Sequence, residues 1–205
     1  MPKYRTRDIR NIALVGHSGS GKTTLAEALL VQSGVKGEAG TVERGSTTMD
    51  YDPLERKFQH SLDSAIASLD YQGMHLNLID TAGIPDFRGP TLASLTAVET
   101  TAVVVNAQSG IELSTRRLMR RAKQRRVCRM IIINKIDIED LDLTQLINDL
   151  REEFGPECLP VNLPADNFST VRDCFFHTEG DTDIFSLAEA HDAIIDQVVE
   201  VNEDL

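Results

Sequence analysis

Hydrophobic and polar positions form alternating blocks along the chain, and these blocks predict strands and helices in turn. Short apolar runs are expected to form buried strands, whereas longer stretches with apolar residues three or four apart are expected to form helices. The expected strands cover 9–15, 62–70, 74–80, 102–107 and 128–133. The expected helices cover 22–33, 90–100, 112–126 and 143–154. Repeated strand–helix units predict an α/β fold with a doubly wound, mostly parallel sheet.

Two regions depart from this alternation. The polar segment 34–61 has little periodicity, and we expect a mobile loop there. After Gly155-Pro156 the pattern changes to short strand-like pieces at 158–163 and 170–176, followed by a helix at 186–201. We therefore predict one domain over residues 1–155 and the beginning of a second, α+β module over 156–205.

Length and composition fit this division. A chain of 205 residues with 41% hydrophobic residues can build one sizeable core and an appendage. No apolar run is long enough to span a membrane, and residues 1–10 lack the apolar centre of a signal peptide. Cys128, Cys158 and Cys174 match neither a disulfide framework nor a zinc pattern, so reduced thiols in the cytoplasm are expected.

The net charge of −11 is unevenly distributed. Residues 1–136 carry 19 Lys/Arg and 13 Asp/Glu, whereas residues 137–205 carry 2 Lys/Arg and 19 Asp/Glu. Seven basic residues lie in one predicted helix: Arg116, Arg117, Arg120, Arg121, Lys123, Arg125 and Arg126. A polyanionic partner would explain this run, and a solvated helix face would explain it equally well.

A glycine-rich loop supplies the first candidate chemistry. Gly16-His17-Ser18-Gly19-Ser20-Gly21-Lys22-Thr23 fits the Walker A pattern and lies between a predicted strand and a predicted helix, as a P-loop requires. The backbone N–H groups of such a loop wrap a phosphate, and the helix N-terminus adds positive potential. We expect Lys22 to reach the β- and γ-phosphates, the Thr23 hydroxyl to bind Mg²⁺, and Thr24 to complete the loop. The fold class is therefore a P-loop NTPase.

The tetrapeptide Asn134-Lys135-Ile136-Asp137 predicts which base is bound. It follows the apolar run 130–133, at the carboxyl end of a predicted buried strand, where α/β sheets bind ligands. The Asp137 carboxylate can accept hydrogen bonds from guanine N1–H and N2–H₂, whereas adenine offers neither donor. Asn134 is expected to fix the loop and contact guanine N7, and the stem of Lys135 is expected to lie over the base.

A third motif lies between these two. The predicted strand 74–80 ends in Asp80-Thr81-Ala82-Gly83, an Asp-x-x-Gly sequence. In GTPases such an aspartate holds Mg²⁺ through water, and the glycine N–H meets the γ-phosphate. We therefore expect Asp80 at the metal and Gly83 at the nucleotide, with GTP or GDP and Mg²⁺ as cofactors.

These motifs resemble the GTPase domain of the elongation factor G family, and most closely its elongation factor G-like paralogue group. The resemblance also rests on Gly40–Tyr51, which is similar to the start of the family's switch I, and on Asp86-Phe87 after the third motif. It implies a cytoplasmic GTP-binding factor whose partner is the ribosome, through rRNA and the acidic-stalk protein, with no membrane or DNA partner. It further implies that 156–205 begins the subdomain inserted into the family's nucleotide domain.

The departures from the family bear on hydrolysis. The family's third motif is Asp-x-Pro-Gly-His, and Ile84 stands at the position of the histidine that orients the attacking water. No catalytic residue is therefore certain, although His60 could substitute. The switch I Arg-Gly-Ile-Thr reads Phe58-Gln59-His60-Ser61, which leaves the Ser61 hydroxyl as the expected Mg²⁺ ligand, with Thr47 and Thr48 as alternatives. Weak or altered hydrolysis is expected.

Several functions stay open at this point. The chain is expected to be an N-terminal piece of a longer protein, because neither the fifth guanine loop nor the last strand of the domain is found. A GTPase that cycles slowly on the ribosome is one interpretation, and a GTP-binding regulatory switch with little turnover is another. A GTPase acting on RNA or in assembly outside translation is the third.

Overall fold

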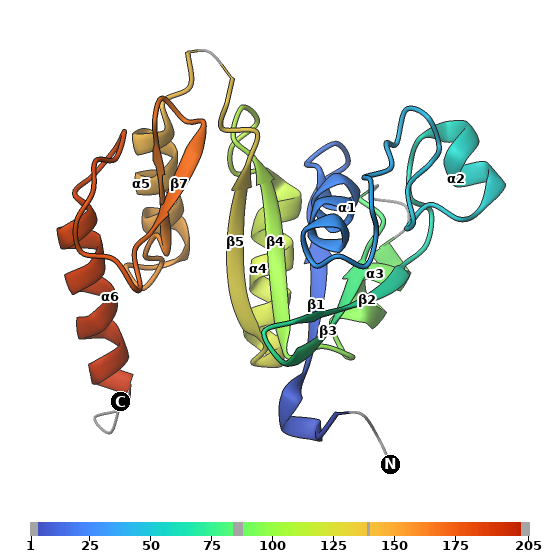
Figure 1. The fold of residues 1–205 in the computed structure, drawn as a ribbon, viewed down its shortest axis with the longest axis horizontal. Helices are drawn as coiled ribbons and strands as arrows, with labels where there is room; N and C mark the ends of the chain where they lie inside the picture. Colours follow the sequence, from blue (N-terminus) through green and yellow to red (C-terminus); the bar gives the residue numbers. More distant parts are fainter. Residues whose placement is uncertain (1–3, 84–87, 139, 202–205) are drawn as a thin grey trace. The chain divides into compact units, whose positions relative to one another are not determined.

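The computed structural model describes residues 4–83, 88–138 and 140–201, and the chain divides into two compact units (Figure 1). The first unit covers Met1–Asn134 and the second covers Lys135–Leu205. This division falls ahead of the boundary predicted after residue 155, so that the helix expected at 143–154 belongs to the second unit. The assignment of 1–155 as the nucleotide domain stays a prediction.

A five-stranded sheet forms the centre of the first unit. Its strands are β1 (Ile9–Val15), β2 (Ala65–Tyr71), β3 (Met74–Asp80), β4 (Thr100–Asn106) and β5 (Cys128–Asn134). They are ordered β2-β3-β1-β4-β5, with β2 antiparallel to β3 and all other neighbours parallel. The predicted mostly parallel sheet is confirmed. Because β1, β3, β4 and β5 run in one direction, their carboxyl ends meet at one edge of the sheet.

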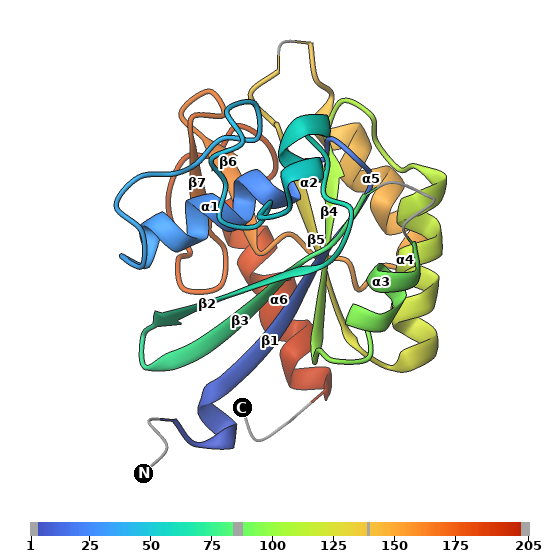
Figure 2. The ribbon, with the colours of Figure 1, turned by 90° about the vertical axis from the view of Figure 1, so that its right-hand side faces the viewer.

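Helices cover both faces of this sheet, as Figure 2 shows, with α1 on one side and α3 and α4 on the other. Their bounds are Lys22–Gln32 for α1, Arg88–Ser94 for α3 and Leu113–Arg125 for α4. A short 3₁₀ turn, Thr6–Asp8, precedes β1. Ala26 and Leu30 of α1 pack with Leu14 and Leu78 of the sheet in the main core cluster.

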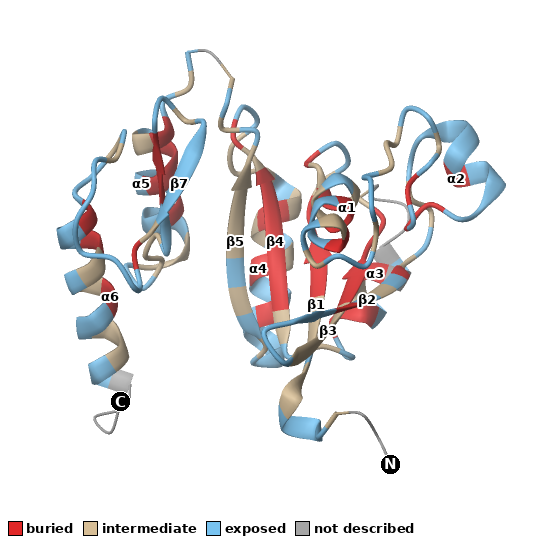
Figure 3. Ribbon diagram, in the orientation of Figure 1, coloured by how far each residue is buried: buried red, intermediate tan, exposed pale blue. Residues whose placement is uncertain are grey.

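The core lies in the middle of the sheet, where the strands are more deeply buried than at the two edges of the sheet (Figure 3). Residues 102–105 of β4 and 13–15 of β1 are almost fully buried. Parallel strands covered by helices on both faces read as continuous apolar runs, and the runs Ala102-Val103-Val104-Val105 and Ala13-Leu14-Val15 have this character. These strands could be predicted from the sequence because burial on both faces produces a continuous apolar run.

One helix was not expected. Within the segment 34–61, which we predict as a loop, residues Pro53–Phe58 form α2. The Asp52 carboxylate caps this helix by accepting from the Leu54 N–H, and the Glu55 carboxylate accepts in return from the Asp52 N–H. An acid three residues ahead of Glu with Pro at the first helical position is a known start signal, so the prediction of a loop throughout 34–61 was wrong.

Other element bounds also differ from expectation. Strand β2 begins at Ala65 rather than at residue 62, because the Glu55 carboxylate accepts from the N–H groups of Leu62 and Asp63. The helix expected at 90–100 ends at Ser94, and the chain turns before β4 begins at Thr100. Apolar residues at 92, 95 and 98 keep helical spacing through that turn, which explains the error.

In the second unit, residues 135–138 and 140–201 are described, and they contain two helices and a hairpin. The helices are α5 (Leu143–Phe154) and α6 (Leu187–Val201), and the antiparallel hairpin pairs β6 (Asn162–Ala165) with β7 (Thr170–Asp173). Strand β7 ends before the expected residue 176, because the Asp173 carboxylate accepts from the N–H groups of Phe175 and Phe176. Strand β6 begins later than the expected 158 and extends past 163, to Ala165. A small core joins Leu163, Cys174, Leu187, Ala190 and Ile194.

Within residues 4–83, 88–138 and 140–201, every helix is too short or too polar to cross a bilayer.

Candidate functional site

The glycine-rich loop joins the end of β1 to the start of α1, and two of its glycines sit where a side chain would collide. A Cβ on Gly16 would lie 2.4 Å from the Val104 carbonyl oxygen, and a Cβ on Gly21 would lie 2.3 Å from Asn134 Nδ2. Gly21 also has φ of 93°, which L side chains rarely adopt. The loop therefore passes close to the carboxyl ends of β4 and β5 and requires glycine to do so.

Asn134, at the end of β5, holds this loop from the side. Its Nδ2 donates to the Ser20 carbonyl oxygen at 2.9 Å. The other two residues of the base-recognition motif, Lys135 and Asp137, are exposed, and Lys135 has a left-handed φ of 62°. They open the second unit, whereas Asn134 lies in the first unit and contacts the loop.

Lys22 is buried at the first position of α1, with its ammonium directed back to the loop. Its Nζ donates to the carbonyl oxygens of Gly16 at 3.2 Å and His17 at 2.8 Å. Burial lowers the pKa of Lys22 below its usual value, and the negative charge of Asp80 opposes that shift. The cation is thus held at the mouth of the loop, where an anion would meet it.

The remaining residues of the loop differ in exposure. Ser18, Gly19 and Thr24 are exposed, and His17 is half-buried with its Nε2 3.4 Å from a carboxylate oxygen of Glu112. The Ser20 hydroxyl is fully buried without a hydrogen-bond partner in the described structure.

Asp80, at the end of β3, faces Thr23 at the start of α1. The Thr23 hydroxyl donates to Asp80 Oδ2 at 2.6 Å, while the buried Oδ1 has no hydrogen-bond partner in the described structure. Burial, helped by the nearby negative charge of Asp50, raises the pKa of Asp80 to about 6 against the hydrogen bond from Thr23 and the charge of Lys22. An unpaired buried carboxylate oxygen is costly unless something binds it.

Of the three switch I hydroxyls considered as metal ligands, Ser61 lies beside Thr23. Ser61 Oγ is 3.4 Å from Thr23 Oγ1 and donates to Asp50 Oδ1 at 2.8 Å. Thr47 instead donates to Asp50 Oδ2 at 2.8 Å, and the Thr48 hydroxyl accepts from Lys36 Nζ. The structure therefore favours Ser61 over Thr47 and Thr48.

These residues fit a divalent cation. Thr23, Ser61, Asp80 and Asp50 supply hydroxyl and carboxylate oxygens in one place, and hard cations such as Mg²⁺ prefer oxygen ligands and keep some of their water. The buried, unpaired Asp80 Oδ1 is the observation that points to a bound positive group. Asp50 was not among the predicted site residues, although it lies in the stretch that resembles switch I.

Two further predicted positions bear on hydrolysis. Gly83 lies against the loop, since a Cβ there would be 2.6 Å from both Lys22 Nζ and the Ser18 nitrogen. This contact brings the third motif to the P-loop. His60 is exposed beside Ser61, and Ile84 lies outside the described residues.

Comparison with known proteins agrees with this geometry. Residues 7–203 match the family described as the elongation factor Tu GTP binding domain. An elongation factor G-like protein of Mycobacterium tuberculosis (strain CDC 1551 / Oshkosh) is 34% identical over 212 residues, which cover 96% of this chain and 29% of the relative. A peptide chain release factor 3 of Limosilactobacillus reuteri (strain DSM 20016) is 33% identical over 175 residues, covering 82% of this chain and 33% of the relative.

The solved structures agree as well. A crystal structure of a protein from Thermus thermophilus matches with a TM-score of 0.83 and 32% identity, covering 96% of this chain and 32% of that one. The chain thus spans about a third of the length of the relatives that it matches. The resemblance to elongation factor G-like proteins is confirmed, and it covers their GTP-binding domain. The chain belongs to the family of the elongation factor Tu GTP binding domain.

Proposed function

We propose that this chain is the GTP-binding domain of an elongation factor G-like factor that acts on the ribosome in the cytoplasm, uses Mg²⁺ and hydrolyses GTP slowly. The observation that carries the nucleotide and metal part is the pairing of buried Asp80 with Thr23, one residue after the buried Lys22. The lysine and the hydroxyl at the start of α1, beside a buried carboxylate with an unpaired oxygen at the end of β3, are the groups that a P-loop GTPase uses to hold phosphate and Mg²⁺.

Each residue would have a separate task. The N–H groups of the loop and of the α1 N-terminus would hold the phosphates, and Lys22 would balance their charge. Thr23 and Ser61 would offer hydroxyl oxygens to the metal, and Asp80 would hold it through water. Bound Mg²⁺ would neutralise negative charge on the β- and γ-phosphates.

Guanine selection would depend on Asp137. Its carboxylate would accept from both guanine donors, so Asp137→Asn should shift preference toward xanthine nucleotides, which carry a carbonyl in place of N2–H₂. Titration with fluorescent GTP, ATP and XTP tests this assignment. Equal binding of GTP and ATP by the wild-type protein would contradict the proposed function.

Slow hydrolysis is expected from the sequence around Gly83. A β-branched hydrocarbon at Ile84 offers no hydrogen bond to an attacking water, and positioned polar groups of that kind contribute roughly 10²–10⁴-fold. Single-turnover hydrolysis on ribosomes should therefore rise in Ile84→His. A large loss in His60→Ala would identify His60 as the substitute, and a wild-type rate equal to that of a standard elongation factor G would refute the role given to Ile84.

The basic helix α4 supports rRNA as the partner. Thr115, Met119 and Ala122 face the core, which leaves Arg117, Arg120, Arg121, Lys123 and Arg125 exposed along the rest of the helix. Replacing Arg117, Arg120 and Arg121 by Gln should weaken ribosome co-sedimentation and flatten its dependence on salt, with nucleotide affinity unchanged. Unchanged binding at several salt concentrations would favour a merely solvated helix face.

Little turnover in the presence of ribosomes would favour a regulatory switch over a cycling GTPase. Both alternatives require the GTP-bound protein to bind ribosomes, so co-sedimentation with a non-hydrolysable GTP analogue separates them from a GTPase outside translation.

A further inference from the structure

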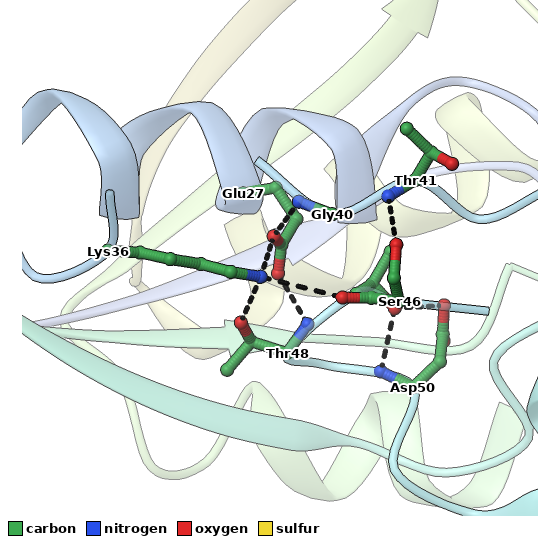
Figure 4. A network of polar contacts seen from close by, with 8 residues as sticks. Glu27, Lys36, Gly40, Thr41, Ser46, Thr48 and Asp50 are labelled. Atoms are coloured by element: carbon green, nitrogen blue, oxygen red, sulfur yellow. Dashed lines mark hydrogen bonds and ion pairs between the residues drawn. The ribbon is translucent and has the colours of Figure 1, made fainter. Parts of the chain in front are cut away.

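Glu27 is a fully buried carboxylate on the core side of α1, and it lies outside the nucleotide loop and the metal cluster. Three donors from a later part of the chain converge on it, as Figure 4 shows. Lys36 Nζ and the Gly40 N–H donate to Oε2 at 2.6 and 2.7 Å, and the Thr48 N–H donates to Oε1. All three of these donors come from the segment that runs from the end of α1 toward Asp50.

The charge of Glu27 matters to this arrangement. Burial alone raises the pKa of a carboxyl group, but hydrogen bonds from Lys36, Thr48 and Gly40 outweigh burial and lower the pKa of Glu27 to about 2. Hydrogen bonds to an ionised acceptor are roughly twice as strong as neutral ones. Glu27 is therefore an ionised anchor, and losing it would leave two backbone N–H groups without their acceptor.

The anchored segment is closely packed around these bonds. Lys36 Nζ also donates to the Thr48 hydroxyl at 3.0 Å and reaches the Ser46 carbonyl oxygen at 3.5 Å. A Cβ on Gly40 would lie 2.1 Å from that same carbonyl oxygen, so the backbone at residue 40 touches the backbone at residue 46. The Thr41 N–H donates to Ser46 Oγ at 3.0 Å.

This packing continues into the metal cluster. Met49, next to Thr48, is 2% exposed and belongs to the main core cluster. Thr47 donates to Asp50, Asp50 accepts from Ser61, and Ser61 lies beside Thr23. A path of hydrogen bonds and adjacent residues therefore runs from Glu27 to Thr23.

The two ends of this path lie on one helix. Thr23 and Glu27 are four residues apart on α1, so their side chains share a face one turn apart. Residues 40–61 thus leave α1 at Glu27 and return to it at Thr23. The position of Asp50 and Ser61 relative to Thr23 depends on where Glu27 holds residues 40 and 48.

We propose that Glu27 is a positioning residue for Mg²⁺, because its carboxylate holds residues 40–48 on α1 and thereby sets Asp50 and Ser61 against Thr23. This inference rests on the proposed function, and it assigns to that site a residue that would touch neither nucleotide nor metal. Glu27 should affect the concentration of Mg²⁺ that GTP binding requires, and should leave Mg²⁺-free binding to the loop nearly intact.

The test measures GTP affinity of the full chain as Mg²⁺ is titrated, with a fluorescent GTP analogue and with EDTA as the metal-free reference. In Glu27→Gln, the Mg²⁺ concentration for half of the metal-dependent gain in affinity should rise about tenfold. Affinity in EDTA should stay within about twofold of wild type. Lys36→Met keeps the backbone donors on Glu27 and should give a smaller rise in the same direction, and it serves if Glu27→Gln does not fold.

Glu99→Gln is the control, at an exposed glutamate outside the metal cluster. Glu99 also accepts two hydrogen bonds, from the backbone and side-chain nitrogens of Asn11 at 2.8 and 3.0 Å, but at the opposite edge of the sheet. Its Mg²⁺ requirement should equal that of wild type. An unchanged Mg²⁺ requirement in both Glu27→Gln and Lys36→Met, or an equal loss of affinity with and without Mg²⁺, would overturn the positioning role alone. A wild-type chain whose GTP binding ignores Mg²⁺ would overturn the proposed function and this inference together.

Discussion

The two halves of the segment between α1 and β2 are both held by a buried glutamate, but the glutamates sit in different places. Residues 36–50 are held from outside, by Glu27 of α1 and by the insertion of Met49 into the core. Residues 52–63 are held from inside, by Glu55 of α2, which accepts from the N–H groups of residues 52, 62 and 63. The second half also leaves two large apolar side chains in solvent, Leu54 and Phe58.

The first half is thus integrated into the packed fold, whereas the second half lies on its surface. Local stability follows buried apolar contacts and protected hydrogen bonds, so the first half should open only with the core. The second half keeps the hydrogen bonds of Glu55 within itself, and it is joined to the first half by side-chain bonds from Arg56 and Ser61 to Asp50 and from Gln59 to Glu43. A movement of the second half with the nucleotide would therefore keep the Glu55 bonds and break those joining side-chain bonds.

The largest effect is expected from the charge of Glu27. Its folded pKa of about 2 lies below the ordinary value of 4.5, so its ionised form stabilises the protein above pH 4.5 and this contribution is lost as pH falls toward 2. The difference corresponds to a contribution on the order of 3 kcal/mol to the free energy of unfolding. Urea unfolding from pH 7 downward should show that Glu27→Gln is less stable than wild type at neutral pH, and that the two converge in acid. A constant gap at every pH would show that the charge facing Lys36 is irrelevant.

A similar loss is expected at Met49. Truncation of a buried methionine leaves a cavity, so Met49→Ala should lower the free energy of unfolding by roughly 3 kcal/mol. Phe58→Ala removes a larger side chain that is 55% exposed, and should change the same quantity by less than about 0.5 kcal/mol. Chemical denaturation of both variants measures the contrast. Equal losses would mean that the two halves are equally integrated into the fold.

A smaller effect is expected from Gly40→Ala. The added Cβ would meet the Ser46 carbonyl oxygen, and relief of this clash should cost about 2 kcal/mol. Gly37→Ala is the control three residues earlier, where nothing lies within 4 Å of the added Cβ. Thermal unfolding should leave the control near wild type. A Gly40→Ala protein as stable as the control would show that the backbone at residues 40 and 46 separates at little cost.

The smallest effect concerns the cap of α2. Asp52→Ala removes the acceptor of the Leu54 N–H and should cost about 1 kcal/mol. Hydrogen exchange should then quicken at the amides of 54–58, whereas the amides of Gly40 and Thr48 keep their protection. Faster exchange at Gly40 and Thr48 as well would join the two halves into one cooperative unit and remove the distinction.

Sequence patterns predicted the parts that depend on local chemistry or on burial. The glycine-rich loop, Asp80 at the end of β3 and Asn134 at the end of β5 could be placed because strand, loop and helix signals are continuous in the chain. The start of α2 was equally local, since Asp52, Pro53 and Glu55 carry the capping signal, and it was missed because hydrophobic periodicity alone does not register a cap.

The roles of Glu27 and Asp50 are of another kind. Glu27 stands among apolar residues of a helix, a pattern that suits a solvent-facing position as well as a buried one. Its partners, Gly40 and Thr48, contribute backbone N–H groups, which no residue type reveals. Asp50 is joined to Ser61 and Thr47 only once the chain has turned back on itself, so the cluster is a product of tertiary structure.

Because Met49 is held in the core, it also limits how far residues 50–64 can move. Residues 50–64 have both ends pinned, one by Met49 in the core and one by the first residue of β2 in the sheet. Fully extended, these residues would span roughly 50 Å at about 3.4 Å per residue, far more than a folded turn and helix occupy. This stretch therefore has enough contour length to unfold and refold without pulling on either end. A protease that cut within it should yield two fragments that stay together, since neither anchorage depends on the continuity of the chain between them.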